Sequence, residues 1–158
     1  MGNARGLRGG TAVIYREFTG ERTYVGRVPA GVDLKEYLEN FVREHGITAA
    51  TINGLGATRS ARIGYYDQGR GEYLTVALDK EMEIVSLVGT VSLQDDRPMV
   101  HAHIAVGDET GHVFGGHLMP GTIVFTAEFI INVLKGRPLV RRHDADTGLA
   151  LWSDVEQE

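Results

Sequence analysis

Cysteine is absent from all 158 residues of this chain. Without thiols the protein can form neither disulfides nor thiolate metal sites, so any metal must be bound by histidine, aspartate or glutamate. No apolar run approaches the roughly 20 residues that would span a bilayer, and the N-terminal sequence MGNARGLRGG lacks the apolar core of a signal peptide. These absences predict a cytoplasmic protein with no membrane partner.

The chain also has no excess of positive charge. The formal net charge is −5, whereas a protein that grips nucleic acid with its whole surface needs many cationic contacts to phosphate. Arginine and lysine are denser near the two ends of the chain, and we interpret those near the C-terminal end, which include Arg141 and Arg142, as solvated surface. The composition is still compatible with a local basic patch.

The pattern of glycines indicates the fold. Twenty-one glycines separate short β-rich runs in a chain of one-domain length, which predicts a mostly antiparallel sheet with tight turns. A hairpin is expected from strands 11–18 and 23–28, joined by a turn at 19–22. The segment 33–45 predicts the main helix, with Asp33 as N-cap and Gly46 as C-cap.

Further strands are expected along the rest of the chain. Residues 61–66 and 72–78 predict a hairpin, 82–93 a strand near the sheet centre, and 122–134 a strand rather than a helix. The glycine-rich segment 53–56 matches neither common phosphate-binding motif, so we interpret it as a turn or a close approach between strand backbones.

Four of the six histidines fall within residues 100–121. Histidine is the commonest metal ligand and titrates near neutral pH, so this clustering needs an explanation. The segment 99–106 predicts a strand, on which side chains two residues apart share a face. His101 and His103 are therefore expected to point the same way.

A hairpin loop is predicted at 107–111, where glycines and an aspartate supply turn chemistry. Pairing Val106 with His112 across this loop would place His117 opposite His101 and turn His112 to the other face. A shift of one residue in this register would separate the histidines.

Three neutral imidazoles with an open fourth position form a recurring catalytic zinc arrangement. His101, His103 and His117 are therefore candidate ligands for zinc or another divalent metal, which would lower the pKa of its water and permit hydrolysis near neutral pH. The alternative is that the three histidines form buried hydrogen bonds or line a subunit contact without metal.

Glu128 interrupts the apolar run 122–134. A carboxylate near the core needs a cation, a hydrogen-bond network or a metal. Glu128 is therefore a candidate partner that orients a histidine of the metal site. Pairing with an arginine, such as Arg59 or Arg62, is the alternative.

The order of short motifs resembles the PPC domain, the plant and prokaryote conserved domain, over roughly residues 10–145, with 1–9 as a flexible N-terminus and 146–158 as a C-terminal tail. The motifs are Gly54-Leu-Gly-Ala57, Gly64-Tyr-Tyr-Asp67, Glu83-Ile-Val-Ser-Leu-Val-Gly-Thr90, His101-Ala-His103, Gly115-Gly-His117 and Thr126-Ala-Glu128.

This resemblance implies an α+β fold, a mostly antiparallel sheet of about seven strands with one main helix, assembled as a homotrimer. It further implies that His101, His103 and His117 bind zinc or a similar ion at or near a subunit boundary. Plant members act in nuclear DNA-binding proteins beside AT-hooks, and prokaryotic members are usually labelled as DNA-binding.

The minor-groove motif of the plant proteins has only a distant match here, Lys135-Gly-Arg-Pro138. Because this tetrapeptide lies between two predicted strands, we interpret it as an ordinary turn. Three hypotheses follow: a PPC-type regulatory protein that binds DNA weakly or through protein partners, a metal-dependent enzyme or small-ligand-binding protein that uses the histidines, or an assembly that the histidines only stabilise.

Overall fold

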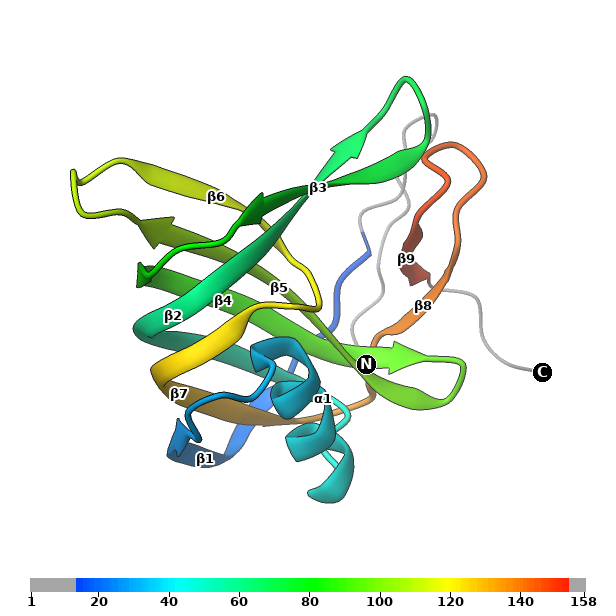
Figure 1. Cartoon of the computed structure of the whole chain (residues 1–158). Helices are drawn as coiled ribbons and strands as arrows, with labels where there is room; N and C mark the ends of the chain where they lie inside the picture. The colour runs from blue at the N-terminus through cyan, green and yellow to red at the C-terminus, as the bar shows by residue number, and fades with distance from the viewer. Residues whose placement is uncertain (1–13, 154–158) are drawn as a thin grey trace.

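One sheet of nine strands and one α-helix make up the described part of the chain, residues 14–153, in the computed structural model shown in Figure 1. This confirms the predicted α+β class, with nine strands in place of about seven. The elements are β1 (Thr19–Val28), α1 (Leu34–Glu44), β2 (Ala50–Asp67), β3 (Glu72–Leu78), β4 (Met82–Gln94), β5 (Arg97–Gly107), β6 (Val113–Leu118), β7 (Ile123–Lys135), β8 (Val140–His143) and β9 (Ala150–Ser153).

The strands run in the order β1-β7-β2-β6-β5-β4-β8-β9, and β3 pairs with β2. All neighbours are antiparallel except β4 and β8. The first part of β2 pairs with β4 and β7, whereas its second part pairs with β3 and β6. The pairings β2–β6, β6–β5, β5–β4 and β4–β2 therefore close a ring of four strands.

Helix α1 contributes to the apolar core. Asp33 caps the helix, because its Oδ1 accepts a hydrogen bond from the Glu36 amide at 2.9 Å. The chain leaves the helix through Gly46 at φ +62°, as its sequence predicts. One helix face is fully buried and joins the core of the sheet; its residues are Leu34, Leu38 and Val42.

Two predictions near the start of the sheet are wrong. No strand forms at 14–18, and residues 11–13 lie outside the described part. The expected turn at 19–22 is instead the beginning of β1, which pairs with β7 from Thr19 onward and absorbs the extra residue in a bulge between Gly20 and Arg22. The partner strand, which is distant in the sequence, supplies the hydrogen bonds that overrule the local turn chemistry.

The segment 53–56 lies inside β2, so the alternative of a close backbone approach is confirmed. A Cβ on Gly56 would lie 2.2 Å from the Thr126 carbonyl oxygen of β7, and β2 has a register shift between Gly54 and Gly56. Glycine thus lets β2 continue between two neighbours. The predicted hairpin of β2 and β3 and the predicted strands 82–93 and 122–134 are confirmed.

The last two strands form a hairpin that packs beside β4. Strand β9 lies in the segment 146–158 that was expected to be a C-terminal tail, and it pairs with β8, which precedes that segment. The Tyr66 hydroxyl of β2 donates a 2.7 Å hydrogen bond to the Thr147 carbonyl of the connecting loop. Within residues 14–153, the only helix is too short to cross a membrane.

Candidate metal centre

Strand β5 presents alternate side chains to two different environments. Ala102, Ile104 and Val106 are buried in the apolar core. His101 and His103 alternate with them and therefore point to the opposite face of the sheet. The shared face predicted for these two histidines is present.

The register of the β5–β6 hairpin differs from the prediction by two residues. His117 lies opposite His103, not opposite His101. The Asp108 amide donates to the His112 carbonyl at 2.9 Å, so these residues close the hairpin in place of the expected Val106–His112 pair. A shift of two residues preserves the face, and His117 therefore still joins the other two histidines.

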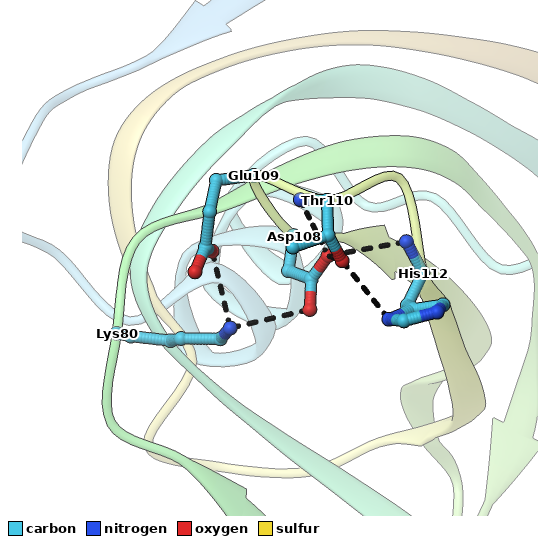
Figure 2. Close-up of polar contacts among 5 residues, drawn as sticks. All are labelled: Lys80, Asp108, Glu109, Thr110 and His112. Atoms are coloured by element: carbon cyan, nitrogen blue, oxygen red, sulfur yellow. Dashed lines mark hydrogen bonds and ion pairs between the residues drawn. The ribbon is translucent and has the colours of Figure 1, made fainter.

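His112 is held apart from these three, as predicted. Figure 2 shows it beside Asp108 and Thr110 in the hairpin loop. The Thr110 hydroxyl donates to Asp108 Oδ1 at 2.6 Å and lies 2.9 Å from His112 Nδ1. The hydroxyl has a single proton, and it uses this proton in the hydrogen bond to Asp108. In the contact between Thr110 and His112, the donor is therefore the Nδ1–H of His112.

Glycine at position 116 allows β6 to approach β2 closely. A Cβ on Gly116 would lie 2.6 Å from the Gly64 carbonyl oxygen. His117 is the residue opposite Gly64 in this pairing. Glycine at position 116 thus lets His117 sit between β2 and β5, next to the other histidines.

The three imidazoles form one compact group. Each imidazole contributes one ring nitrogen to a cluster in which all three nitrogens lie within 4.8 Å of one another; the residues are His101, His103 and His117. The ring centroids are 5.1–5.6 Å apart. A tetrahedral zinc ion separates neighbouring nitrogens by about 3.4 Å, so modest rotation of these rings would close them around an ion.

The electrostatics keep two of the rings neutral. Burial lowers the pKa of His101 to about 4, and the nearby Arg141 adds to this shift. Burial also lowers the pKa of His117 to about 4, with a contribution from His103. Neutral imidazoles have a free lone pair at neutral pH, which is the form that binds metal.

The donor set fits a divalent cation with nitrogen ligands. His117 Nδ1 is buried and has no hydrogen-bond partner among residues 14–153, a costly state for a polar atom that an ion would relieve. Three neutral imidazoles suit zinc and other borderline transition ions better than calcium or magnesium, which prefer oxygen.

Arg141 of β8 adds a guanidinium to this site. The interpretation of this residue as solvated surface is wrong, because it is only 7% exposed. Its Nε donates to Ser92 Oγ at 3.0 Å, its Nη1 to the Ala150 carbonyl at 3.0 Å, and its Nη2 lies 3.3 Å from His101 Nδ1. Its sequence neighbourhood carried no signal of burial.

Glu128 is not brought into the three-histidine group. It is exposed on β7, opposite Arg27 of β1 and Leu55 of β2. Nor does either arginine considered as its partner pair with it: Arg62 binds Asp79 at 2.6 Å, and Arg59 lies over the Phe125 ring. Its suggested role in orienting a histidine stays a prediction.

Solved structures share this fold. A metal-containing protein from Archaeoglobus fulgidus is 42% identical, with a TM-score of 0.83 over 87% of this chain and 97% of that one. A plant- and prokaryote-conserved (PPC) protein from Pyrococcus horikoshii is 41% identical, with a TM-score of 0.83 over 92% and 100%. A proposed DNA-binding protein from Ralstonia eutropha JMP134 is 25% identical, with a TM-score of 0.75 over 86% and 94%.

Curated relatives contain a similar segment within longer chains. The bifunctional protein GlmU of Synechococcus sp. strain JA-3-3Ab is 37% identical over 129 residues, which are 80% of this chain and 20% of that protein. The GlmU of strain JA-2-3B'a(2-13) is 33% identical over the same length, 19% of its chain. The present chain thus spans about a fifth of the curated relatives that it matches.

The family model for the Plants and Prokaryotes Conserved (PCC) domain matches residues 15–135. This range includes β1 to β7 and all three clustered histidines. With most of its length matched, and with the fold of a solved PPC protein, the chain belongs to the Plants and Prokaryotes Conserved domain family, also written PPC.

Proposed function

We propose that this chain is a metal-binding PPC-domain protein in which His101, His103 and His117 hold a divalent cation, with zinc as the first choice. The observation that carries the proposal is the convergence of their ring nitrogens within 4.8 Å. The metal content of the A. fulgidus protein adds support. When bound, such an ion supplies positive charge and an open coordination position for a ligand.

Metal analysis of the untagged protein tests this proposal. We expect stoichiometric binding by the wild type and a loss of affinity of more than about 100-fold in His103→Ala, since removal of a ligand costs more than removal of a supporting contact. His103 is exposed, so this change should leave the fold intact. His112→Ala, outside the group, is the matched control.

Absence of stoichiometric zinc, cobalt or nickel in the wild type would refute the metal proposal. Equal metal affinity in the wild type and His103→Ala would do the same. Glu128→Gln belongs in the same series. A lower affinity in this variant would support the predicted role of Glu128 in orienting a histidine, and an unchanged affinity would remove it.

We further propose that the protein acts in the cytoplasm as a homotrimer that binds DNA weakly or through protein partners. The DNA-binding role proposed for the R. eutropha relative favours DNA as a partner, whereas the net charge of −5 argues for few direct phosphate contacts. The shared metal site would then lie at or near a subunit boundary.

Titration of duplex DNA at several salt concentrations tests the second proposal. Direct binding should weaken as salt rises, with a log–log slope that reports the number of phosphate contacts. Binding that does not depend on salt, or no binding to any duplex at low salt, would exclude direct DNA contact and leave only the route through partners.

A further inference from the structure

Arg141 is a buried cation for which residues 14–153 supply no carboxylate partner. Among residues 14–153 no ion pair includes it, although it is only 7% exposed. Arginine has five N–H donors, and within the described part of the chain the three contacts to Ser92, Ala150 and His101 leave two of them unused. A buried charge normally has a partner of opposite sign, because desolvation is otherwise uncompensated.

A cation bound by the three histidines would release a further N–H donor of the Arg141 guanidinium. Arginine only donates, so its contact with His101 requires an unprotonated Nδ1 on that ring. A cation bound at Nδ1 would take this lone pair. A cation bound at Nε2 would displace the proton to Nδ1, which then could not accept. Either way, Arg141 would lose its contact with His101.

Positive charge would then accumulate without compensation. The candidate metal ligands are three histidines with no acidic residue among them, and the side chain next to them, Arg141, is itself a cation. A divalent ion beside the guanidinium therefore needs an anion. An oxyanion matches the planar fork of arginine through parallel charge-assisted hydrogen bonds.

We propose that Arg141 binds a small oxyanion, the carboxylate or phosphate group of a ligand, beside the cation held by His101, His103 and His117. This inference rests on the proposed metal binding and gives the site a ligand class. Ser92 and the Ala150 carbonyl hold the guanidinium in place. Trp152 lies against it, with the Arg141 Cζ 5.4 Å from the ring centroid.

Trp152 is the only tryptophan of the chain and reports on this site directly. Zinc-loaded protein, freed of excess zinc, is titrated with phosphate and with acetate at constant ionic strength, and chloride serves as the control anion. We expect saturable changes in tryptophan fluorescence with an oxyanion but not with chloride. The stronger of the two responses identifies phosphate or carboxylate as the preferred group.

Arg141→Met should weaken oxyanion binding by about 10- to 100-fold, the range expected for a lost charge-assisted hydrogen bond. Arg142→Met, an exposed arginine on the same strand, should leave it unchanged. Metal-free wild type should bind at least about tenfold more weakly than the zinc-loaded protein. This comparison needs no variant, so it stands even if Arg141→Met does not fold.

The zinc content of the wild type distinguishes a failure of the proposed metal binding from a failure of the proposed oxyanion binding. A wild type that takes up no zinc refutes the proposed metal function and this inference with it. A zinc-loaded wild type with no saturable response to either oxyanion refutes the inference alone. So does equal oxyanion affinity in folded Arg141→Met, or in the metal-free wild type.

Discussion

Asp108 organises the loop between β5 and β6 through several short contacts. Its Oδ1 accepts hydrogen bonds from the Thr110 amide and hydroxyl and from the His112 amide, and its Oδ2 lies 3.2 Å from Lys80 Nζ (Figure 2). The Thr110 hydroxyl is the main cause that holds the Asp108 pKa well below its usual range. One carboxylate therefore fixes the turn that aligns His117 with His103.

This shift predicts how stability depends on pH. A carboxylate whose pKa is lower in the folded than in the unfolded protein stabilises the fold at pH values above its unfolded pKa, about 3.9. The contribution is lost as the pH falls below that value. Asp108→Asn should therefore destabilise the protein at pH 7, and by clearly less at pH 2.5. Urea unfolding at both pH values measures this, and an equal penalty at the two would contradict it.

At the residue scale, strand alternation was enough to predict that His101, His103 and His117 lie together, because alternation survives a register error of two residues. Arg141 could not be predicted in the same way. It reaches His101 through the parallel pairing of β4 and β8, a contact between distant segments that local periodicity does not encode. The apolar run around Glu128 suggested a position near the core, whereas Glu128 is exposed on β7, because an apolar run does not show which face of its strand is buried.

Strand β6 is the element on which the candidate metal site depends most. It is six residues long and lies between β2 and β5. Its contact with β2 requires glycine at position 116, since a Cβ there would lie 2.6 Å from a backbone oxygen that cannot move aside. The width of this gap sets how near His117 comes to the other two histidines.

Gly116→Val should therefore lower the free energy of unfolding by about 1–3 kcal/mol, the usual cost of overpacking, and should weaken metal binding as well. Gly20→Ala is the matched control, because no atom lies within 4 Å of a Cβ at that position. Its effect should stay within about 0.5 kcal/mol. Denaturant titration measures both, and equal stability of the two variants would show that β2 and β6 can separate without cost.

At the scale of elements, local signals predicted the helix well because its cap, its apolar face and its terminal glycine lie within 14 residues, 33–46. They failed at the N-terminal hairpin. Thr19 and Gly20 carry turn chemistry, but β7 pairs with them across more than a hundred residues of sequence. Bulges and turns use the same residue types, so only the partner strand distinguishes them.

Several large apolar side chains are exposed on the surface of the described part of the molecule. Val88 lies directly opposite His103 and is 54% exposed. Large apolar side chains are also exposed on β2, β6 and β7: Leu55, Phe114 and Phe125. Contact surfaces are rich in exposed apolar side chains, and a contact over Val88 would put the boundary of the proposed homotrimer next to His103.

Sedimentation equilibrium tests this assembly. The wild type should have three times the chain mass of 17.3 kDa. Val88→Lys should shift the equilibrium toward monomer, because a charge would have to be buried at the boundary. Arg142→Met, which changes an exposed residue of β8, should not. A monomeric wild type at high concentration would exclude the trimer, and a fully trimeric Val88→Lys would place the boundary elsewhere.

The hairpin of β8 and β9 has a further consequence for comparison among relatives. The family model ends at residue 135, so the histidines lie inside the shared region, whereas Arg141 and Trp152 lie beyond it. The histidines and the Arg141–Trp152 pair are thus encoded in separate stretches of sequence, which can diverge independently. A relative that keeps the three histidines and has a different hairpin is therefore expected to differ in the groups beside the proposed ion. Conversely, a fragment cut at the family boundary would keep the three histidines but lose Arg141.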